Sequence, residues 1–149
     1  MKPTTFQKPH LISLAYALLI LLWSYTGLSK LIDHAAFEKQ VTTLLTEKYP
    51  ESISIGIPVL EILTAFSLVW NSTRMLGLYL SVLLMTAFTA YVALVIAGHF
   101  GPAPCTCGGI ISALSWKAHL ILNITILSLV LYLLFHQKQK GGSRDTMSN

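Results

Sequence analysis

The chain has 149 residues, of which 54% are hydrophobic and 11% are charged, and its mean hydropathy is +0.65. Soluble domains carry roughly 25% charged residues, so this composition excludes an ordinary soluble domain and indicates a single integral membrane domain. The net charge of +4 is small and is not clustered as in nucleic-acid-binding proteins, and two cysteines are too few for a disulfide framework.

The first apolar run covers residues 11–31. Its length matches the ~20 helical residues that cross a bilayer. Lys2 and Lys8 precede it, as basic residues precede the apolar part of a signal peptide, but the run is long and no small-x-small cleavage site follows. We therefore expect a retained transmembrane helix.

The next segment, residues 33–52, is polar but contains a helical pattern. Its apolar residues recur at helical spacing: Phe37, Val41, Leu44 and Leu45. Asp33 or His34 is expected to start this helix, and Pro50 to limit it. The pattern predicts a short amphipathic helix that lies on the membrane surface.

Three further apolar runs follow, over residues 53–70, 75–97 and 118–135. The polar turn at residues 71–74 is so short that the second and third spans must be antiparallel neighbours. We therefore expect an all-α, integral membrane four-helix bundle within residues 1–136. The remaining residues, 137–149, are rich in Gly, Ser, Gln and Lys and are expected to form a disordered basic tail.

The distribution of basic residues predicts the topology. Four spans place both termini on one side of the membrane. That side collects six of the 10 basic residues: Lys2, Lys8, Arg74, Lys138, Lys140 and Arg144. The positive-inside rule then places both termini in the cytoplasm, and it places the loop with the cysteines outside, where thiols can be oxidised.

The two cysteines lie in the polar segment GPAPCTCGG, residues 101–109, between the third and fourth spans. Cys105 and Cys107 can close a small disulfide ring if Pro104 and the glycines after the pair form a turn. A strained ring favours exchange with the thiols of a partner, whereas a static staple of this spacing gains little loop entropy. A soft-metal site is the third interpretation, but no second ligand pair is evident, and no metal ligand set is predicted.

Polar residues at the start of the fourth span are candidates to assist these thiols. Trp116, His119 and Asn123 share one face of the expected helix, and that face begins close to the cysteines. His119 can take a thiol proton, and a cationic His119 or Lys117 would favour the thiolate. The alternative for His119 is a polar seam between helices, which is the expected role of Asn123.

Glu61 is the only acid inside a predicted span, about 12 Å along its helix. A charge at that depth is expensive and indicates a functional site by default. Lys30, near the outer end of the first span, is expected to pair with Glu61, and a proton relay is the alternative. Gly27, one turn before Lys30, allows the two helices to approach closely.

The first three spans resemble the DoxX-like membrane proteins. The resemblance rests on Gly27, Lys30, Leu31, Asp33 and Phe37 at the end of the first span. It also rests on PVLEILTAFSLVW and TRMLGLYLSVLLMTAF in the second and third spans. The CTCGG loop followed by SWKAHLILN resembles, more narrowly, the methylamine utilisation protein MauE branch of these proteins.

This resemblance implies a four-helix inner-membrane protein linked to thiol redox chemistry. MauE proteins are associated with maturation of the disulfide-rich small subunit of methylamine dehydrogenase, beside a thioredoxin-like partner. Cys105 and Cys107 match the cysteine pair of the branch, and Glu61 matches the acid of its second span. The Gly-Gly ending of the loop and the Trp-Lys-x-x-His continuation indicate a diverged member, so the exported client is left open.

We therefore expect an inner-membrane thiol–disulfide redox protein that supports oxidative maturation of an exported, disulfide-containing client through Cys105 and Cys107. Electrons would pass to or from a periplasmic thioredoxin-like protein, or to a quinone held among the helices. No motif identifies the quinone or any other cofactor. The alternatives are a non-catalytic membrane scaffold for a thioredoxin-like partner and a membrane protein that handles a soft metal.

Overall fold

The computed structural model describes residues 8–44, 50–99 and 115–145, and its regular elements are α-helices. Four of them are long and apolar enough to cross a membrane: α1 (Lys8–Ile32), α3 (Pro50–Val69), α4 (Arg74–Ile96) and α5 (Trp116–Asp145). The fifth, α2 (His34–Leu44), is short. These ranges contain no strand, so the predicted all-α fold with four membrane spans is confirmed.

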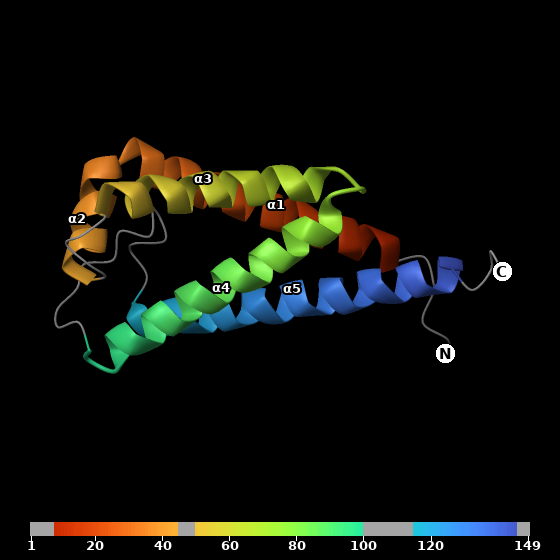
Figure 1. Ribbon diagram of the computed structural model, residues 1–149. Coiled ribbons are helices and arrows are strands. Elements are labelled where there is room, and N and C mark those ends of the chain that lie inside the picture. The colour runs from red at the N-terminus through yellow and green to blue at the C-terminus, as the bar shows by residue number, and fades with distance from the viewer. Residues whose placement is uncertain (1–7, 45–49, 100–114, 146–149) are drawn as a thin grey trace.

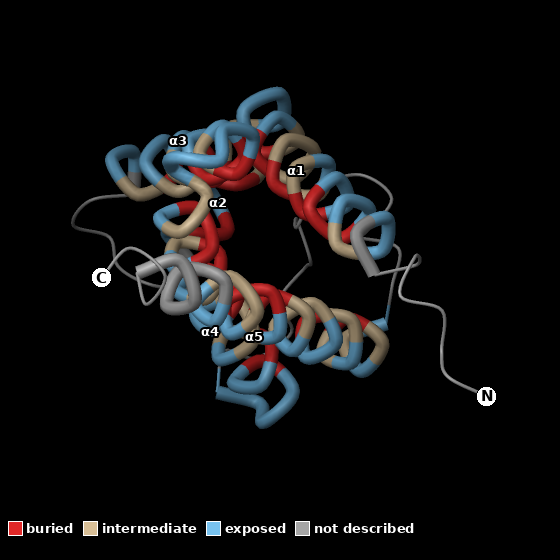
Figure 2. Tube along the Cα trace, turned by 90° about the vertical axis from the view of Figure 1, so that its right-hand side faces the viewer, coloured by how far each residue is buried: buried red, intermediate tan, exposed pale blue. Residues whose placement is uncertain are grey.

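The long helices are arranged as two pairs. Helix α1 packs along α3, and α4 packs along α5, while contacts between α3 and α4 join the two pairs (Figure 1). Helix α2 lies at one end of the bundle and contacts α3 and α1. Viewed at right angles, buried residues on both pairs face the space between them (Figure 2).

The turn between α3 and α4 is closed by side chains that satisfy the last carbonyl groups of α3. The Thr73 hydroxyl donates to the Ser67 carbonyl at 2.8 Å, and Nε of Arg74 donates to the Leu68 carbonyl at 3.2 Å. The Arg74 guanidinium also lies 4.5 Å from the ring centroid of Tyr16 in α1. The carbonyl groups in the last turn of a helix have no partner within that helix, and here the side chains of the turn supply the partners. As predicted, the tight polar turn joins two neighbouring helices.

Helix α2 turns its apolar side to the bundle rather than to lipid. Phe37 and Val41 are buried, and Ser54 Oγ of α3 lies 3.1 Å from His34 Nε2. The Phe37 amide donates to the Asp33 carbonyl, so the new helix begins directly after α1 ends. This immediate turn folds α2 back over the end of the bundle, where its apolar side chains are covered.

Helix α3 contains two prolines in different roles. Pro50 begins the helix, where the missing N–H would have had no partner in any case. Pro58 lies inside the helix and removes the hydrogen bond that the Ser54 carbonyl would otherwise accept. The Pro58 carbonyl lies beside Gly27 of α1, where an added Cβ would come within 3.0 Å of it. The two helices therefore approach closely at this point.

Helix α5 is longer than the sequence predicts. It begins at Trp116 and continues to Asp145, so residues 137–145 are helical, and the expectation of a disordered tail is wrong for them. The Lys138 ammonium lies 5.6 Å from the ring centroid of Tyr79 in α4. Gln and Lys are good helix formers, and this cation–π contact supports the helix beyond its apolar run.

The bundle core changes character along its length. The half nearer the termini contains a cluster of buried apolar residues, among them Leu19, Leu68, Leu78, Val130 and Leu133. The half nearer α2 contains buried polar and charged side chains: Lys30, Gln40, Glu61, His119 and Asn123. In a membrane such groups are expensive unless they are paired or functional, so this second half holds the candidate site.

Candidate functional site

An ion pair joins α1 to α3 inside the bundle. Lys30 Nζ donates to Glu61 Oε1, and the two side chains are 5% and 0% exposed. Gly27 makes the approach possible, because a Cβ there would lie 2.8 Å from Ile62 Cγ1 and 3.4 Å from Glu61 Cβ. The structure confirms the expected Lys30–Glu61 pair and the expected close approach at Gly27.

Aromatic rings surround the ammonium of this pair. Lys30 Nζ lies 4.8 Å from the ring centroid of Phe88 in α4 and 5.6 Å from that of Phe37 in α2. Desolvated cation–π contacts of this kind stabilise a buried ammonium. The second carboxylate oxygen of Glu61, Oε2, is buried and has no hydrogen-bond partner within the described ranges. The pair thus keeps an acceptor atom that can receive a proton or a hydrogen bond.

A second set of contacts runs from α2 through α4 to α5. Gln40 Nε2 donates to the Tyr91 hydroxyl at 2.8 Å. The Tyr91 ring meets Trp116 edge-on, with the centroids 6.4 Å apart, and Trp116 stacks on His119, also at 6.4 Å. His119 is 4% exposed. These contacts fix the first turn of α5 against α4 and hold the imidazole inside the bundle.

Trp23 marks the boundary between the polar half and the apolar core. Its Nε1 donates to the Ser81 hydroxyl of α4 at 2.9 Å, and both side chains are buried. The Trp23 ring lies 6.3 Å from that of Phe88, which is also close to Lys30. The indole is part of the apolar cluster and therefore links that cluster to the aromatic ring beside Lys30.

A cavity of about 240 Å³ lies among these groups. It is bounded by residues of every described helix, and most of its lining is apolar. Its lining also includes six side chains with hydrogen-bonding groups besides Trp23: Thr26, Lys30, Gln40, Tyr91, His119 and Asn123. An apolar pocket with a few convergent polar groups is the usual form of a small-molecule site.

The structure brings His119 and Asn123 together at this cavity, as expected from their shared helix face. Lys117 is exposed and does not line it. Cys105 and Cys107 lie outside the described residues. The nearest described residues on either side are His99 and Ser115. His99 follows the end of α4 and Ser115 precedes the start of α5, and both of these helix ends lie on the α2 side of the bundle. The start of α1 and the end of α5 lie on the opposite side (Figure 1).

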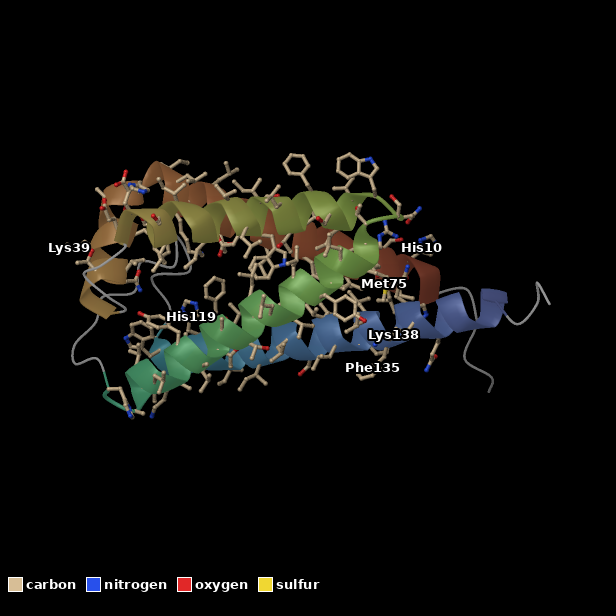
Figure 3. All side chains as sticks on the ribbon, in the orientation of Figure 1. His10, Lys39, Met75, His119, Phe135 and Lys138 are labelled. Atoms are coloured by element: carbon tan, nitrogen blue, oxygen red, sulfur yellow. The ribbon has the colours of Figure 1, made fainter. Side chains whose placement is uncertain are left out.

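The labelled side chains show which residues lie at each end of the bundle. His119 and Lys39 lie toward the α2 end, whereas His10, Met75 and Lys138 lie toward the opposite end (Figure 3). Met75, near the start of α4, is therefore remote from the end of that helix, which precedes the cysteines in the sequence. Among the described residues there is no group of three or more His, Cys, Asp or Glu side chains that would hold a metal ion.

Sequence reasoning missed four of the hydrogen-bonding side chains around this cavity: Trp23, Thr26, Gln40 and Tyr91. Gln40 interrupts the apolar stripe of its helix, since it follows Phe37 by three positions, and that spacing indicates an inward-facing amide. Tyr91 and Trp23 lie away from the ends of their spans, where aromatic residues with polar groups usually collect. That displacement was the available signal.

Comparison with known proteins is consistent with this architecture. The family model described as methylamine utilisation protein MauE matches residues 8–136. This range includes α1, α3, α4, most of α5 and the connection that carries the cysteines. No match is found among curated proteins or among solved structures. A match over this much of the chain means that the protein belongs to the methylamine utilisation protein MauE family.

Proposed function

We propose that this chain is an inner-membrane thiol–disulfide redox protein that supports oxidative maturation of an exported protein through Cys105 and Cys107. Membership of the MauE family itself suggests a membrane protein associated with methylamine utilisation. The redox role is the finer proposal. One observation carries it: the chain's two cysteines form a single Cys-Thr-Cys unit in the connection to α5, whose first fully helical turns carry the buried His119.

The described residues on either side of this connection support the proposal. It leaves the described chain at His99 and re-enters at Ser115, on the α2 side of the bundle. The same half of the bundle contains the buried ion pair, the Gln40–Tyr91 hydrogen bond and the cavity. A scaffold that only positioned a partner would not need polar groups buried in this half of the bundle.

The proposed reaction is a two-electron exchange. A thiolate of the client attacks one sulfur of the Cys105–Cys107 disulfide, which breaks that bond and forms a mixed disulfide. A second client thiolate then attacks the client sulfur of the mixed disulfide. The client leaves with a new disulfide, and Cys105 and Cys107 are left as thiols, so the client is oxidised and the pair is reduced.

The proposed setting is a bacterial inner membrane with both termini in the cytoplasm and the cysteines facing the periplasm. The partners are a periplasmic thioredoxin-like protein and an exported, disulfide-containing client. The charge distribution supports this orientation, because six of the 10 basic residues belong to the side with the termini. An oxidising compartment is also the one in which such a pair can turn over.

Trapping of thiols in intact cells tests the proposal. Cells are treated with a maleimide of known mass, before and after dithiothreitol, and the protein is resolved on a gel. A redox pair gives both the oxidised and the reduced form, and the ratio shifts when the growth medium is made more oxidising. The double variant Cys105→Ser/Cys107→Ser is the control and takes up no maleimide under any condition.

The same experiment separates the two rival functions. A pair that is fully oxidised under all conditions indicates a static staple in a membrane scaffold. Thiols that react only after a chelator is added indicate a soft-metal site. Either result contradicts the redox proposal.

A further inference from the structure

We propose that the cavity between the two helix pairs binds the head group of a lipid-soluble quinone, which accepts the electrons that Cys105 and Cys107 take from a client. The site consists of described residues alone, with Lys30, Gln40, Tyr91 and His119 as its polar groups. The electron-transfer part of this inference rests on the proposed function, whereas the binding part does not.

The position of the cavity favours a ligand that arrives from the membrane. Its walls are formed by α2 and by the membrane-spanning segments of α1, α3, α4 and α5. Several lining residues on the spanning helices are only partly buried, among them Leu22 and Thr26 of α1 and Leu122 and Ile126 of α5. A volume of about 240 Å³ exceeds what single buried waters occupy. The mostly apolar wall suits a ring with an isoprenoid tail.

The polar groups suit a molecule with two oxygen atoms on opposite sides of a ring. Lys30 of α1 offers an ammonium on one helix pair. Tyr91 of α4 and His119 of α5 offer a hydroxyl and an imidazole on the other pair. Quinone carbonyl oxygens accept hydrogen bonds, and donors in a low-dielectric pocket bind them more strongly than donors in water do.

Gln40 gives independent support for a ligand. Its side chain lines the cavity and is 8% exposed, and its Nε2 donates to Tyr91. Its Oε1 is buried and has no hydrogen-bond partner within the described part of the chain. A buried acceptor without a partner is costly. A hydroquinone has two O–H donors, so the reduced ligand would supply the missing hydrogen bond.

The contrast between the two halves of the bundle argues against accidental packing. Toward the start of α1 and the end of α5, the four long helices bury a continuous apolar cluster. Toward α2, the bundle surrounds a cavity with charged and polar side chains from α1, α2, α4 and α5. Polar groups at membrane depth face one another or a functional cavity, and here Lys30 does both.

The electron transfer balances without any further reactant. Reduced Cys105 and Cys107 lose two electrons and two protons as their S–H bonds break and an S–S bond forms. The quinone gains two electrons and two protons and becomes a hydroquinone with two new O–H bonds. The disulfide is thereby regenerated for another client, and the hydroquinone leaves into the lipid.

Binding is tested with the full chain in nanodiscs of phosphatidylcholine and phosphatidylglycerol, with decylubiquinone as the probe. Trp23 lines the cavity, so a bound quinone should quench its fluorescence to a saturable limit. Thr26→Phe places a ring in the cavity and should weaken binding at least tenfold. The control Leu28→Phe, on the same helix, alters a side chain that is 52% exposed and should leave binding unchanged.

Gln40→Leu gives a second test with a side chain of similar size. It removes the Oε1 acceptor for a hydroquinone O–H, so it should weaken binding of reduced decylubiquinone about tenfold. Quenching that never saturates, or that is equal in the wild type and in Thr26→Phe, would mean that a lipid acyl chain fills the cavity, and it would overturn the inference.

Two further results separate this inference from the proposed function. Cys105→Ser/Cys107→Ser should bind decylubiquinone as the wild type does but should not reduce it. Reduced wild type should form one hydroquinone for each disulfide that it forms, and the loss of quinone absorbance measures this reaction. Binding without reduction would contradict the electron-acceptor role. Clients oxidised through Cys105 and Cys107 without any quinone binding would overturn the site and leave the proposed function standing.

Discussion

Lys30 donates a hydrogen bond to Glu61 between two helices that meet at a glycine one turn away. Both side chains are buried among membrane-spanning helices, and Lys30 also lines the cavity. The pair therefore serves two purposes: it neutralises two charges in low dielectric, and it places an ammonium beside the space where a ligand can bind.

Lys30→Met should destabilise the protein by about 3–5 kcal/mol, because it leaves the Glu61 carboxylate buried without its partner. Glu61→Gln should lower the free energy of unfolding by a similar amount, because it leaves the Lys30 ammonium buried without its partner. The double variant should recover part of the loss. The measurement is the free energy of unfolding in mixed micelles, with Lys117→Met as the control because Lys117 is exposed. Simple additivity of the two single changes would contradict the pairing.

Gly27→Ala should destabilise the bundle by about 1–3 kcal/mol. The added methyl group would meet Ile62 Cγ1 at 2.8 Å and the Pro58 carbonyl at 3.0 Å, so α1 and α3 would have to separate. Gly56→Ala is a matched control within α3, since nothing lies within 4 Å of its added Cβ. That control should leave stability unchanged or raise it by up to about 1 kcal/mol. Equal effects at the two glycines would contradict the close approach.

Ser81→Ala should cost about 1–3 kcal/mol, because it leaves the buried indole N–H of Trp23 without its acceptor. Ser128→Ala is the control: its hydroxyl only donates to the carbonyl of Ile124 on the same helix, at an exposed position. The control should change the free energy of unfolding by less than about 0.5 kcal/mol. The same unfolding assay applies, and a neutral Ser81→Ala would show that the Trp23–Ser81 bond contributes nothing.

Much of this fold was predictable from the sequence, because membrane spans are coded by the length of apolar runs. The four long helices contain nearly all of the residues of the predicted spans. The pairing of Lys30 with Glu61 was also predictable, since two opposite charges inside adjacent spans have few other ways to be neutralised. Gly27 followed from the same reasoning, because a close helix approach needs a small residue.

The remaining features depend on tertiary contacts that a single segment does not reveal. The end of α5 is helical beyond its apolar run, where Lys138 packs on Tyr79 of another helix. The inward turn of α2 depends on where α1 ends and on the covering of Phe37 and Val41 by the bundle. The hydrogen bond from Gln40 to Tyr91 joins residues 51 positions apart, so no local pattern indicates it.

The topology is testable with impermeant reagents. A tag after Asn149 should be reached only from the cytoplasm, because six of the 10 basic residues lie on the side with the termini. In a variant that retains only Cys105, the thiol should be labelled by an impermeant maleimide added to intact spheroplasts. The reverse labelling pattern would place the cysteines in a reducing compartment and would contradict the redox proposal.

The most direct test of the central proposal is to trap the exchange intermediate. Each of Cys105→Ser and Cys107→Ser leaves one sulfur. That sulfur can attack the disulfide of an oxidised partner, but no second cysteine of the pair remains to release the partner from the mixed disulfide. One of the two single variants should accumulate a covalent complex with an exported thioredoxin-like protein or client. The complex should be visible on a non-reducing gel and be lost with reductant. His119→Ala in that background should slow its formation. Absence of any complex in both single variants, together with normal maturation of exported disulfide proteins in the double variant, would contradict the account.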